Sequence, residues 1–194
     1  MNYYIADTHF RHGNVMVYDK RPWDDVDVME HDMIERWNKR VTDKDDVYIL
    51  GDFCWGKKKD WLRLLSLLKG KKHIICGNHD PKNFPQEILD LLAEPPAHYM
   101  EIKDGDYYLG LCHYPIIAYH SDANPNTILL YGHVHNTIEF DAVNEAIKAM
   151  KKKCQEAGFD YKGNLYNCWC GFFDWQPATL EEILANEQAH QKLD

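Results

Sequence analysis

The chain has 194 residues, of which 45% are hydrophobic and 27% charged, a balance that is typical of globular proteins and excludes disordered and fibrous classes. Its formal charge of −9, from 22 Lys and Arg against 31 Asp and Glu, excludes a chain-wide attraction for nucleic-acid phosphates. No apolar run approaches the roughly 20 residues of a membrane span, so we expect no membrane partner.

The amino-terminal residues and the cysteines favour a cytoplasmic protein. The chain starts without a basic segment and reaches a carboxylate at Asp7, which is too early for a signal peptide. Six cysteines without a CxxC pair stand at positions 54, 76, 112, 154, 168 and 170. In a reducing compartment they are expected to be free thiols or small core residues. Cys168 and Cys170 could bind a soft metal, but their spacing favours a strand that points both side chains to one face.

Short apolar runs predict five strands. They cover residues 3–5, 47–50, 73–76, 107–112 and 128–131. The turn sequence Asp104-Gly105-Asp106 predicts a hairpin that pairs residues 99–103 with the run 107–112.

Between these runs, apolar residues recur every three or four positions, which predicts amphipathic helices. The helical patterns cover residues 26–41, 61–68 and 140–154, and Gly158 is a stop signal for the last of them. A capping box, Thr179-Leu180-Glu181-Glu182, predicts a further helix near the end. Alternating strands and helices predict an α/β layered fold. Because the sequence shows no repeat or linker, we expect residues 1–194 to form a single domain.

Polar side chains follow the apolar runs at the point where each predicted strand ends. They stand in the segments Asp7-Thr8-His9, Gly51-Asp52, Gly77-Asn78-His79-Asp80, His113 and Gly132-His133-Val134-His135. Ligands of open α/β sheets bind beyond the carboxyl ends of the strands, so we expect these side chains to form one cluster. Gly51, Gly77 and Gly132 stand beside its members, where a tight backbone turn would let the side chains converge.

Seven of these residues are candidate metal ligands: Asp7, His9, Asp52, Asn78, His113, His133 and His135. Their oxygen and imidazole donors suit Mn²⁺, Fe²⁺ or Zn²⁺, and no thiolate is required. Seven ligands are too many for one tetrahedral site and fit two ions that share a bridging carboxylate. Two divalent ions, two carboxylates and a bridging hydroxide leave a charge of about +1, which would attract a phosphate even on an acidic chain.

These five segments, in this order, resemble the motifs of the calcineurin-like metallophosphoesterases, and the resemblance spans residues 3 to 135. Each motif alone is weak, but five in order are highly specific. The stretches 7–14 and 173–183, with Arg21-Pro22, look like those of small bacterial and phage members, although such relatives often have glycine where Arg11 stands. The resemblance implies a four-layer α/β/β/α sandwich of two packed mixed sheets flanked by helices.

The resemblance also implies ligand sets and a reaction. One ion would take Asp7, His9, Asp52 and His135, and the other would take Asp52, Asn78, His113 and His133, with Asp52 as the bridge. A hydroxide between the two ions would attack phosphorus. His79, oriented by Asp80, would stabilise the transition state or protonate the leaving oxygen. Mn²⁺ is the metal we expect, with Fe²⁺, Zn²⁺ and Ni²⁺ as alternatives.

Four further residues are candidates for substrate contact. Arg11 could clamp a phosphate oxygen or could equally be a solvated loop residue. His12 and Asn14 follow the first metal motif, and Trp55 follows the second and could stack on a base or an aryl leaving group. We expect the segment 114–127 to carry specificity, since loops on a rigid scaffold commonly do so.

The leading hypothesis is a phosphodiesterase that acts on a small or cyclic nucleotide-like phosphate ester. A phosphomonoesterase or a nuclease could use the same centre, although the acidic chain shows no basic track for a long polymer. The other class is a non-catalytic metal-binding scaffold, against which the presence of His79 beside all seven ligands argues. The aromatic content of 13% leaves room for an interface between copies of the chain.

Overall fold

The computed structural model describes residues 1–189, so residues 190–194 of the predicted domain lie outside the described part of the chain. The first of its two sheets contains the parallel strands β1 (Asn2–Ile5), β2 (Asp46–Leu50) and β3 (Lys71–Ile75), in that order. Ala178, far along the chain, adds an antiparallel bridge to Tyr4. All three strands were predicted, with ends shifted by one or two residues.

The second sheet contains β4 (Tyr99–Asp104), β5 (Tyr107–Cys112), β6 (Thr127–Tyr131) and β7 (Leu165–Asn167), in that order. The predicted hairpin is confirmed, because β4 and β5 pair antiparallel around the Gly105 turn. The strands β5, β6 and β7 pair in parallel, so this sheet is mixed. Parallel pairing brings the carboxyl ends of β5 and β6 to the same edge.

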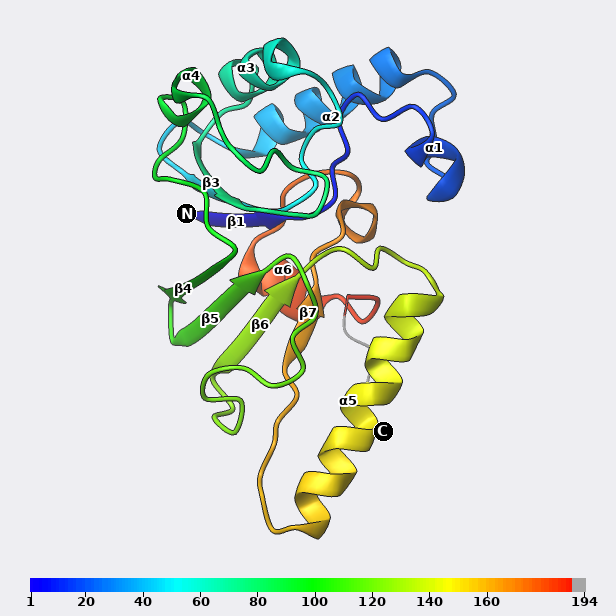
Figure 1. The fold of residues 1–194 in the computed structure, drawn as a ribbon, viewed down its shortest axis with the longest axis vertical. Helices are drawn as coiled ribbons and strands as arrows, with labels where there is room; N and C mark the ends of the chain where they lie inside the picture. The colour runs from blue at the N-terminus through cyan, green and yellow to red at the C-terminus, as the bar shows by residue number, and fades with distance from the viewer. Residues whose placement is uncertain (190–194) are drawn as a thin grey trace.

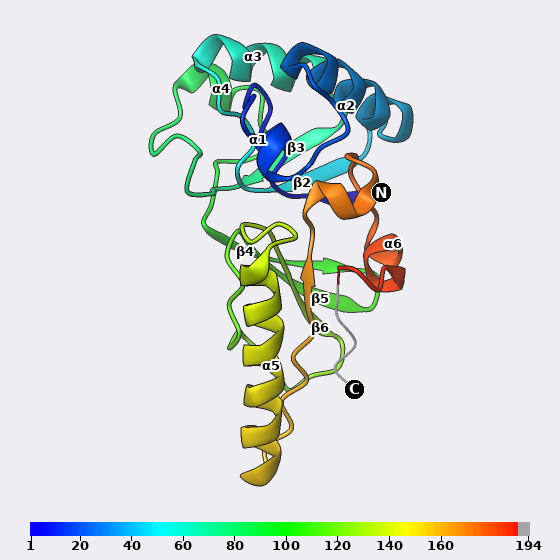
Figure 2. The same cartoon turned by 90° about the vertical axis from the view of Figure 1, so that its right-hand side faces the viewer.

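Helices cover the outer faces of both sheets, which gives four layers in the order α/β/β/α (Figure 1). The first sheet is covered by α2 (Val26–Arg40), α3 (Lys58–Leu67) and α4 (Gln86–Leu89). The long helix α5 (Ile138–Glu156) lies against the second sheet, as Figure 2 shows from the side. The shorter elements are α1 (Val15–Tyr18), the 3₁₀ helix η1 (Cys170–Phe173) and α6 (Leu180–Ala185). The predicted α/β sandwich is confirmed.

Three apolar clusters hold these layers together. One packs Trp37 of α2 and Trp61 of α3 on the first sheet, and another fills the space between the sheets with side chains such as Leu50 and Leu130. The third packs Ile147 of α5 on the second sheet. Burying one large apolar side chain contributes roughly 1.5–3 kcal/mol. Strands held on both faces in this way present their carboxyl ends on a rigid support.

Capping residues in the sequence mark where two of the helices begin. The Asp25 carboxylate accepts hydrogen bonds from the backbone N–H groups of Asp27 and Val28 and caps α2. The predicted capping box of α6 is confirmed, because the Thr179 N–H donates to the Glu182 carboxylate and the Glu182 N–H donates to Thr179 Oγ1.

The expectation for Cys168 and Cys170 is wrong. Cys168 follows β7 and packs between the two sheets, whereas Cys170 begins η1 and packs in the cluster beneath α2. Strand β7 ends at Asn167, Trp169 bridges to Ala6 beyond β1, and η1 begins at Cys170, so the alternation of a strand does not extend over both cysteines. All six cysteines are free thiols, as predicted. Among residues 1–189, every helix falls short of the length and apolar character needed to cross a bilayer.

Candidate metal centre

The seven predicted ligands follow the carboxyl ends of five strands. Asp7 and His9 follow β1, Asp52 follows β2, Asn78 follows β3, His113 follows β5, and His133 and His135 follow β6. Ligand atoms of Asp7, His9 and His135 lie within 4.8 Å of one another, and so do those of Asp7, Asp52 and His113. The fold therefore brings together two groups of donors that could each hold an ion.

The distances between donors suit shared metal ions. Asp52 Oδ2 lies 3.6 Å from His9 Nε2 and 3.7 Å from His113 Nε2. His135 Nε2 lies 3.6 Å from Asp7 Oδ1 and 3.3 Å from His9 Nε2. Two ligand atoms that each lie about 2.1 Å from one tetrahedral ion are about 3.4 Å apart. Asp52 Oδ2 thus stands between the two donor groups, where a bridging carboxylate would be needed.

The proton position on His113 leaves one ring nitrogen for a metal. His113 Nδ1 donates to the carbonyl oxygen of Leu50 at 2.8 Å, and a carbonyl only accepts. Burial lowers the pKa of His113 and favours the neutral ring, in which Nε2 carries a lone pair. That lone pair faces Asn78 Oδ1 at 3.0 Å and the Asp52 carboxylate. Electron-rich atoms that face each other in this way call for a cation between them.

His135 is held in a similar way by a carboxylate. Its Nδ1 lies 2.6 Å from Asp19 Oδ1, and Asp19 Oδ2 accepts from Arg21 Nη2 at 2.8 Å. Burial opposes protonation of His135, but the carboxylates of Asp19 and Asp7 outweigh it and raise the pKa of the ring. Asp19, which is 116 residues from His135, was not predicted from the sequence. The only available signal was its place beside the Arg21-Pro22 pair.

The charge balance of the cluster also fits a metal. Burial raises the pKa of the Asp7 carboxyl to about 7 and lowers the pKa of His9. Within the described residues, His133 Nδ1 is buried and has no hydrogen-bond partner. Two buried carboxylates, Asp7 and Asp52, therefore stand beside His9, His113 and His133, whose pKa values burial lowers. A divalent ion would supply the missing positive charge.

The glycines beside the ligands allow the close approach that the sequence predicted. A Cβ at Gly77 would lie 2.2 Å from Asp52 Oδ1, and a Cβ at Gly51 would lie 2.3 Å from His113 Nδ1. A Cβ at Gly132 would likewise collide with the carboxylate of the first motif. Any side chain at these positions would push a ligand out of the cluster.

Left-handed backbone is concentrated in the ligand loops. It occurs at Asp7 (φ 57°), His9 (φ 49°), Asp52 (φ 52°), His133 (φ 73°) and His135 (φ 47°). Each such residue costs roughly 1–2 kcal/mol relative to ordinary backbone and persists only where its surroundings hold it. The fold thus maintains a costly arrangement that orients these donors.

The buried Asp80 carboxylate is held by the backbone of two loops. Its carboxylate accepts from the backbone N–H groups of Asp52 at 3.0 Å, Phe53 at 3.0 Å and Gly77 at 2.8 Å. Burial raises its pKa to about 6. These contacts tie together the loops that follow β2 and β3. The expectation that Asp80 orients the His79 ring stays a prediction.

A cleft of about 480 Å³ opens beside the donors. The Trp55 ring stacks on the His12 ring with 4.2 Å between the ring centres, and its centre lies 4.6 Å from that of the His79 ring. Asn14 lines the same cleft. His12 therefore occupies one face of Trp55, which leaves only part of the indole for a base or an aryl group. The roles of His12, Asn14 and Trp55 in substrate binding stay predictions.

Arg11 and the middle of the segment 114–127 lie outside the cleft beside the donors. The Arg11 guanidinium contacts the exposed Asp27 carboxylate and does not line the cleft. Tyr114 packs its ring edge against His133 at 4.8 Å, so the start of the segment reaches the cluster. The middle of the segment instead lines a separate hollow.

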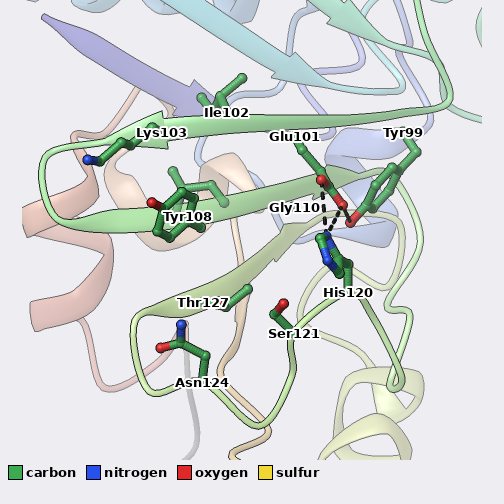
Figure 3. Close-up of a pocket in the computed structure, with 11 residues that line it drawn as sticks. Tyr99, Glu101, Ile102, Lys103, Tyr108, Gly110, His120, Ser121, Asn124 and Thr127 are labelled. Carbon is green, nitrogen blue, oxygen red and sulfur yellow. Dashed lines mark hydrogen bonds and ion pairs between the residues drawn. The ribbon is translucent and has the colours of Figure 1, made fainter.

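This outer hollow has a volume of about 390 Å³. It lies on the same face of the second sheet as α5, over the parts of β4 and β5 that the helix does not cover (Figure 3). Glu101 accepts from the Tyr99 hydroxyl at 3.0 Å and lies 3.2 Å from His120 Nδ1. Lys103 stands over the Tyr108 ring at 5.6 Å. The charged groups of the outer hollow are therefore paired with neighbouring side chains.

Comparisons with known proteins support the fold but assign no family. No family model matches the chain. An uncharacterized protein of Methanocaldococcus jannaschii is 38% identical in an alignment of 112 positions that covers 53% of this chain and 64% of that relative. A protein of unknown function from Aquifex aeolicus is 26% identical with a TM-score of 0.65, over 95% of this chain and 98% of its own.

More distant structures include one phosphoesterase. YfcE, a phosphoesterase from E. coli, matches 69% of this chain and 69% of its own at 18% identity, with a TM-score of 0.37. A single mutant of Vps29 from Entamoeba histolytica matches 69% of this chain and 64% of its own, with the same identity and TM-score.

Proposed function

We propose that this protein is a dinuclear metal-dependent phosphoesterase of the calcineurin-like type, which prefers phosphodiesters with small nucleotide-like groups. The observation that carries the proposal is the orientation of two imidazole rings. His113 and His135 have their Nδ1 atoms engaged by Leu50 and Asp19, so both turn Nε2 toward the buried carboxylates. Such a geometry serves metal ligation better than hydrogen bonding.

The donors divide into two sets that share Asp52. Asp7, His9, Asp52 and His135 would hold one ion, and Asp52, Asn78, His113 and His133 would hold the other. Two divalent ions held there would neutralise charge on the phosphate oxygens and lower the pKa of a coordinated water. The oxygen and nitrogen donors favour Mn²⁺, with Fe²⁺, Zn²⁺ and Ni²⁺ as alternatives.

His79 would act on the leaving group. Its backbone N–H donates to Asp52 Oδ1 at 3.0 Å, which fixes the start of the side chain beside the cluster. The ring is exposed in the cleft and rests near the Trp55 ring. From there it would hold a proton for the leaving oxygen, as a general acid does.

The cleft supports a preference for diesters over monoesters. Among the described residues that line it, none is Lys or Arg, and Asp19 and Glu139 add carboxylates. The second negative charge of a monoester would therefore find no fixed cation beyond the metal ions. Trp55 and Tyr18 instead offer apolar surface for the organic group of a diester.

The test compares bis-p-nitrophenyl phosphate with p-nitrophenyl phosphate, using chelator-treated protein with Mn²⁺, Ni²⁺, Zn²⁺ or Mg²⁺ added back. Asp52→Asn removes the proposed bridge, and Asp27→Asn is a matched control on an exposed carboxylate that pairs with Arg11. Metal-dependent turnover in the wild type and the control, lost in Asp52→Asn, would support the proposal. A faster reaction with the monoester would contradict the diester preference. Bound ions without turnover of either ester or of a nucleotide panel would favour a non-catalytic metal-binding protein.

A further inference from the structure

A buried ion pair lies directly behind the donor cluster. Asp19 and Arg21 follow α1, and their side chains are 4% and 0% exposed. Arg21 donates to Asp19 Oδ2 through Nε at 3.0 Å and through Nη2 at 2.8 Å. Burying an ion pair is costly unless its hydrogen bonds are complete, so the contacts of the remaining atoms reveal what the pair does.

The second oxygen of Asp19 determines the proton position on His135. Asp19 Oδ1 lies 2.6 Å from His135 Nδ1. A carboxylate that is ion-paired to Arg21 only accepts, so the imidazole proton resides on Nδ1. In the neutral ring, the Nε2 lone pair then faces Asp7 and His9. Asp19 thereby presents His135 in the form that binds a metal.

Arg21 holds the opposite side of the same donor group. Its Nη1 donates to the carbonyl oxygen of Thr8 at 2.8 Å, and its Nη2 donates to the carbonyl oxygen of Asp7 at 3.0 Å. The guanidinium also stands 4.7 Å from the centre of the Trp175 ring. Arg21 therefore ties the left-handed Asp7 loop to Asp19, and through Asp19 to His135.

We propose that Asp19 and Arg21 are positioning residues that set the affinity of one of the two metal ions, the one held by Asp7, His9 and His135. The inference rests on the metal centre of the proposed function but is independent of the substrate. The other donor group takes its orientation from elsewhere, because His113 Nδ1 donates to the Leu50 carbonyl. The pair should therefore affect the two ions unequally.

Asp19→Asn tests the role of the carboxylate with little change in shape. The amide oxygen would still accept from Arg21, but the amide NH₂ would now donate to His135 Nδ1. The imidazole proton would move to Nε2 and block that nitrogen as a ligand. We expect one Mn²⁺ ion to bind about 10–100-fold more weakly, while the affinity for the other changes less than about twofold.

The measurement is a Mn²⁺ titration of the chelator-treated full chain against a competing fluorescent chelator, together with the melting temperature of the metal-free protein. Asp27→Asn removes the same charge from an exposed ion pair and should bind both ions like the wild type. Arg21→Lys keeps the charge but cannot reach the carboxylate and both carbonyls, so it should weaken the same ion as Asp19→Asn.

The possible outcomes separate this inference from the proposed activity. Unchanged binding of both ions by Asp19→Asn would overturn the inference. Equal weakening of both ions, with a lower melting temperature of the metal-free protein, would mean a merely structural role and would also overturn it. Selective loss of one ion supports it, even if the wild type hydrolyses no phosphate ester, in which case only the proposed activity fails. A wild type that binds none of Mn²⁺, Fe²⁺, Zn²⁺ and Ni²⁺ would overturn both.

Discussion

The donor cluster and the outer hollow are two places where polar side chains gather, and they differ in how their charges are paired. In the outer hollow, Glu101 is paired with Tyr99 and His120 at the surface. In the cluster, the carboxylates of Asp7 and Asp52 are buried and face imidazole nitrogens at 3.6–3.7 Å. The adjoining spaces are of similar size, about 480 and 390 Å³. Buried carboxylates that face imidazole nitrogens, rather than volume, therefore distinguish the candidate metal centre.

The largest expected effect is on catalysis at the bridge of the cluster. Asp52→Asn removes the charge shared by both donor sets, so diester hydrolysis should fall by roughly 10³-fold or more. Initial rates at saturating Mn²⁺ measure it. A loss of less than tenfold would mean that Asp52 does not bridge two ions.

His79→Ala should separate chemistry from metal binding. Because His79 lines the cleft without belonging to either donor set, its loss should lower kcat by about 10²–10⁴-fold. Elemental analysis should show that the variant binds as much metal as the wild type does. A variant that loses metal as well as activity would place His79 among the ligands instead.

Metal binding should stabilise the cluster and leave the outer hollow unaffected. A metal concentration 100 times the Kd should add about 2.7 kcal/mol per ion to the free energy of unfolding, which raises Tm by roughly 5–10 °C for each ion in a chain of this size. Differential scanning calorimetry with and without a chelator measures the shift. The same gain in Asp52→Asn would show that the ions bind elsewhere.

The same substitution should have different effects in the two regions. A Cβ at Gly77 would meet the backbone N of Asp52 at 2.5 Å, so Gly77→Ala should cost about 1–3 kcal/mol of stability and weaken metal binding. A Cβ at Gly110, in the floor of the outer hollow, meets first the hydroxyl of Tyr99 at 2.9 Å, which is the end of a movable side chain. Gly110→Ala should change stability by less than about 1 kcal/mol, as measured by urea unfolding. Equal costs would remove the contrast between the regions.

The smallest effect is expected for Glu101→Gln. Its carboxylate lies at the surface, where such interactions contribute at most about 0.5–1 kcal/mol. Diester hydrolysis should stay within twofold of the wild type, and so should metal affinity. A larger change in either quantity would link the outer hollow to the function of the cluster.

The order of strands and donors could be predicted because each is a local property of the chain. A strand buried on both faces appears as an apolar run, and the residue after it leaves the sheet at a known edge. This is why Asp7, Asp52 and His113 could be selected together before any contact was known. β7 escaped prediction because it has only three residues, too few to show an alternating pattern.

The sequence by itself determined the α/β layering and the set of candidate ligands, since the hydrophobic period and the order of the motifs are local properties of the chain. Only the tertiary structure decided how those ligands are oriented. The Asp19–His135 contact, the three backbone hydrogen bonds to Asp80 and the pairing of Arg11 with Asp27 all depend on how separate loops pack. Such contacts leave no periodic trace, because a hydrogen bond between distant segments constrains direction and distance in space and not spacing in sequence.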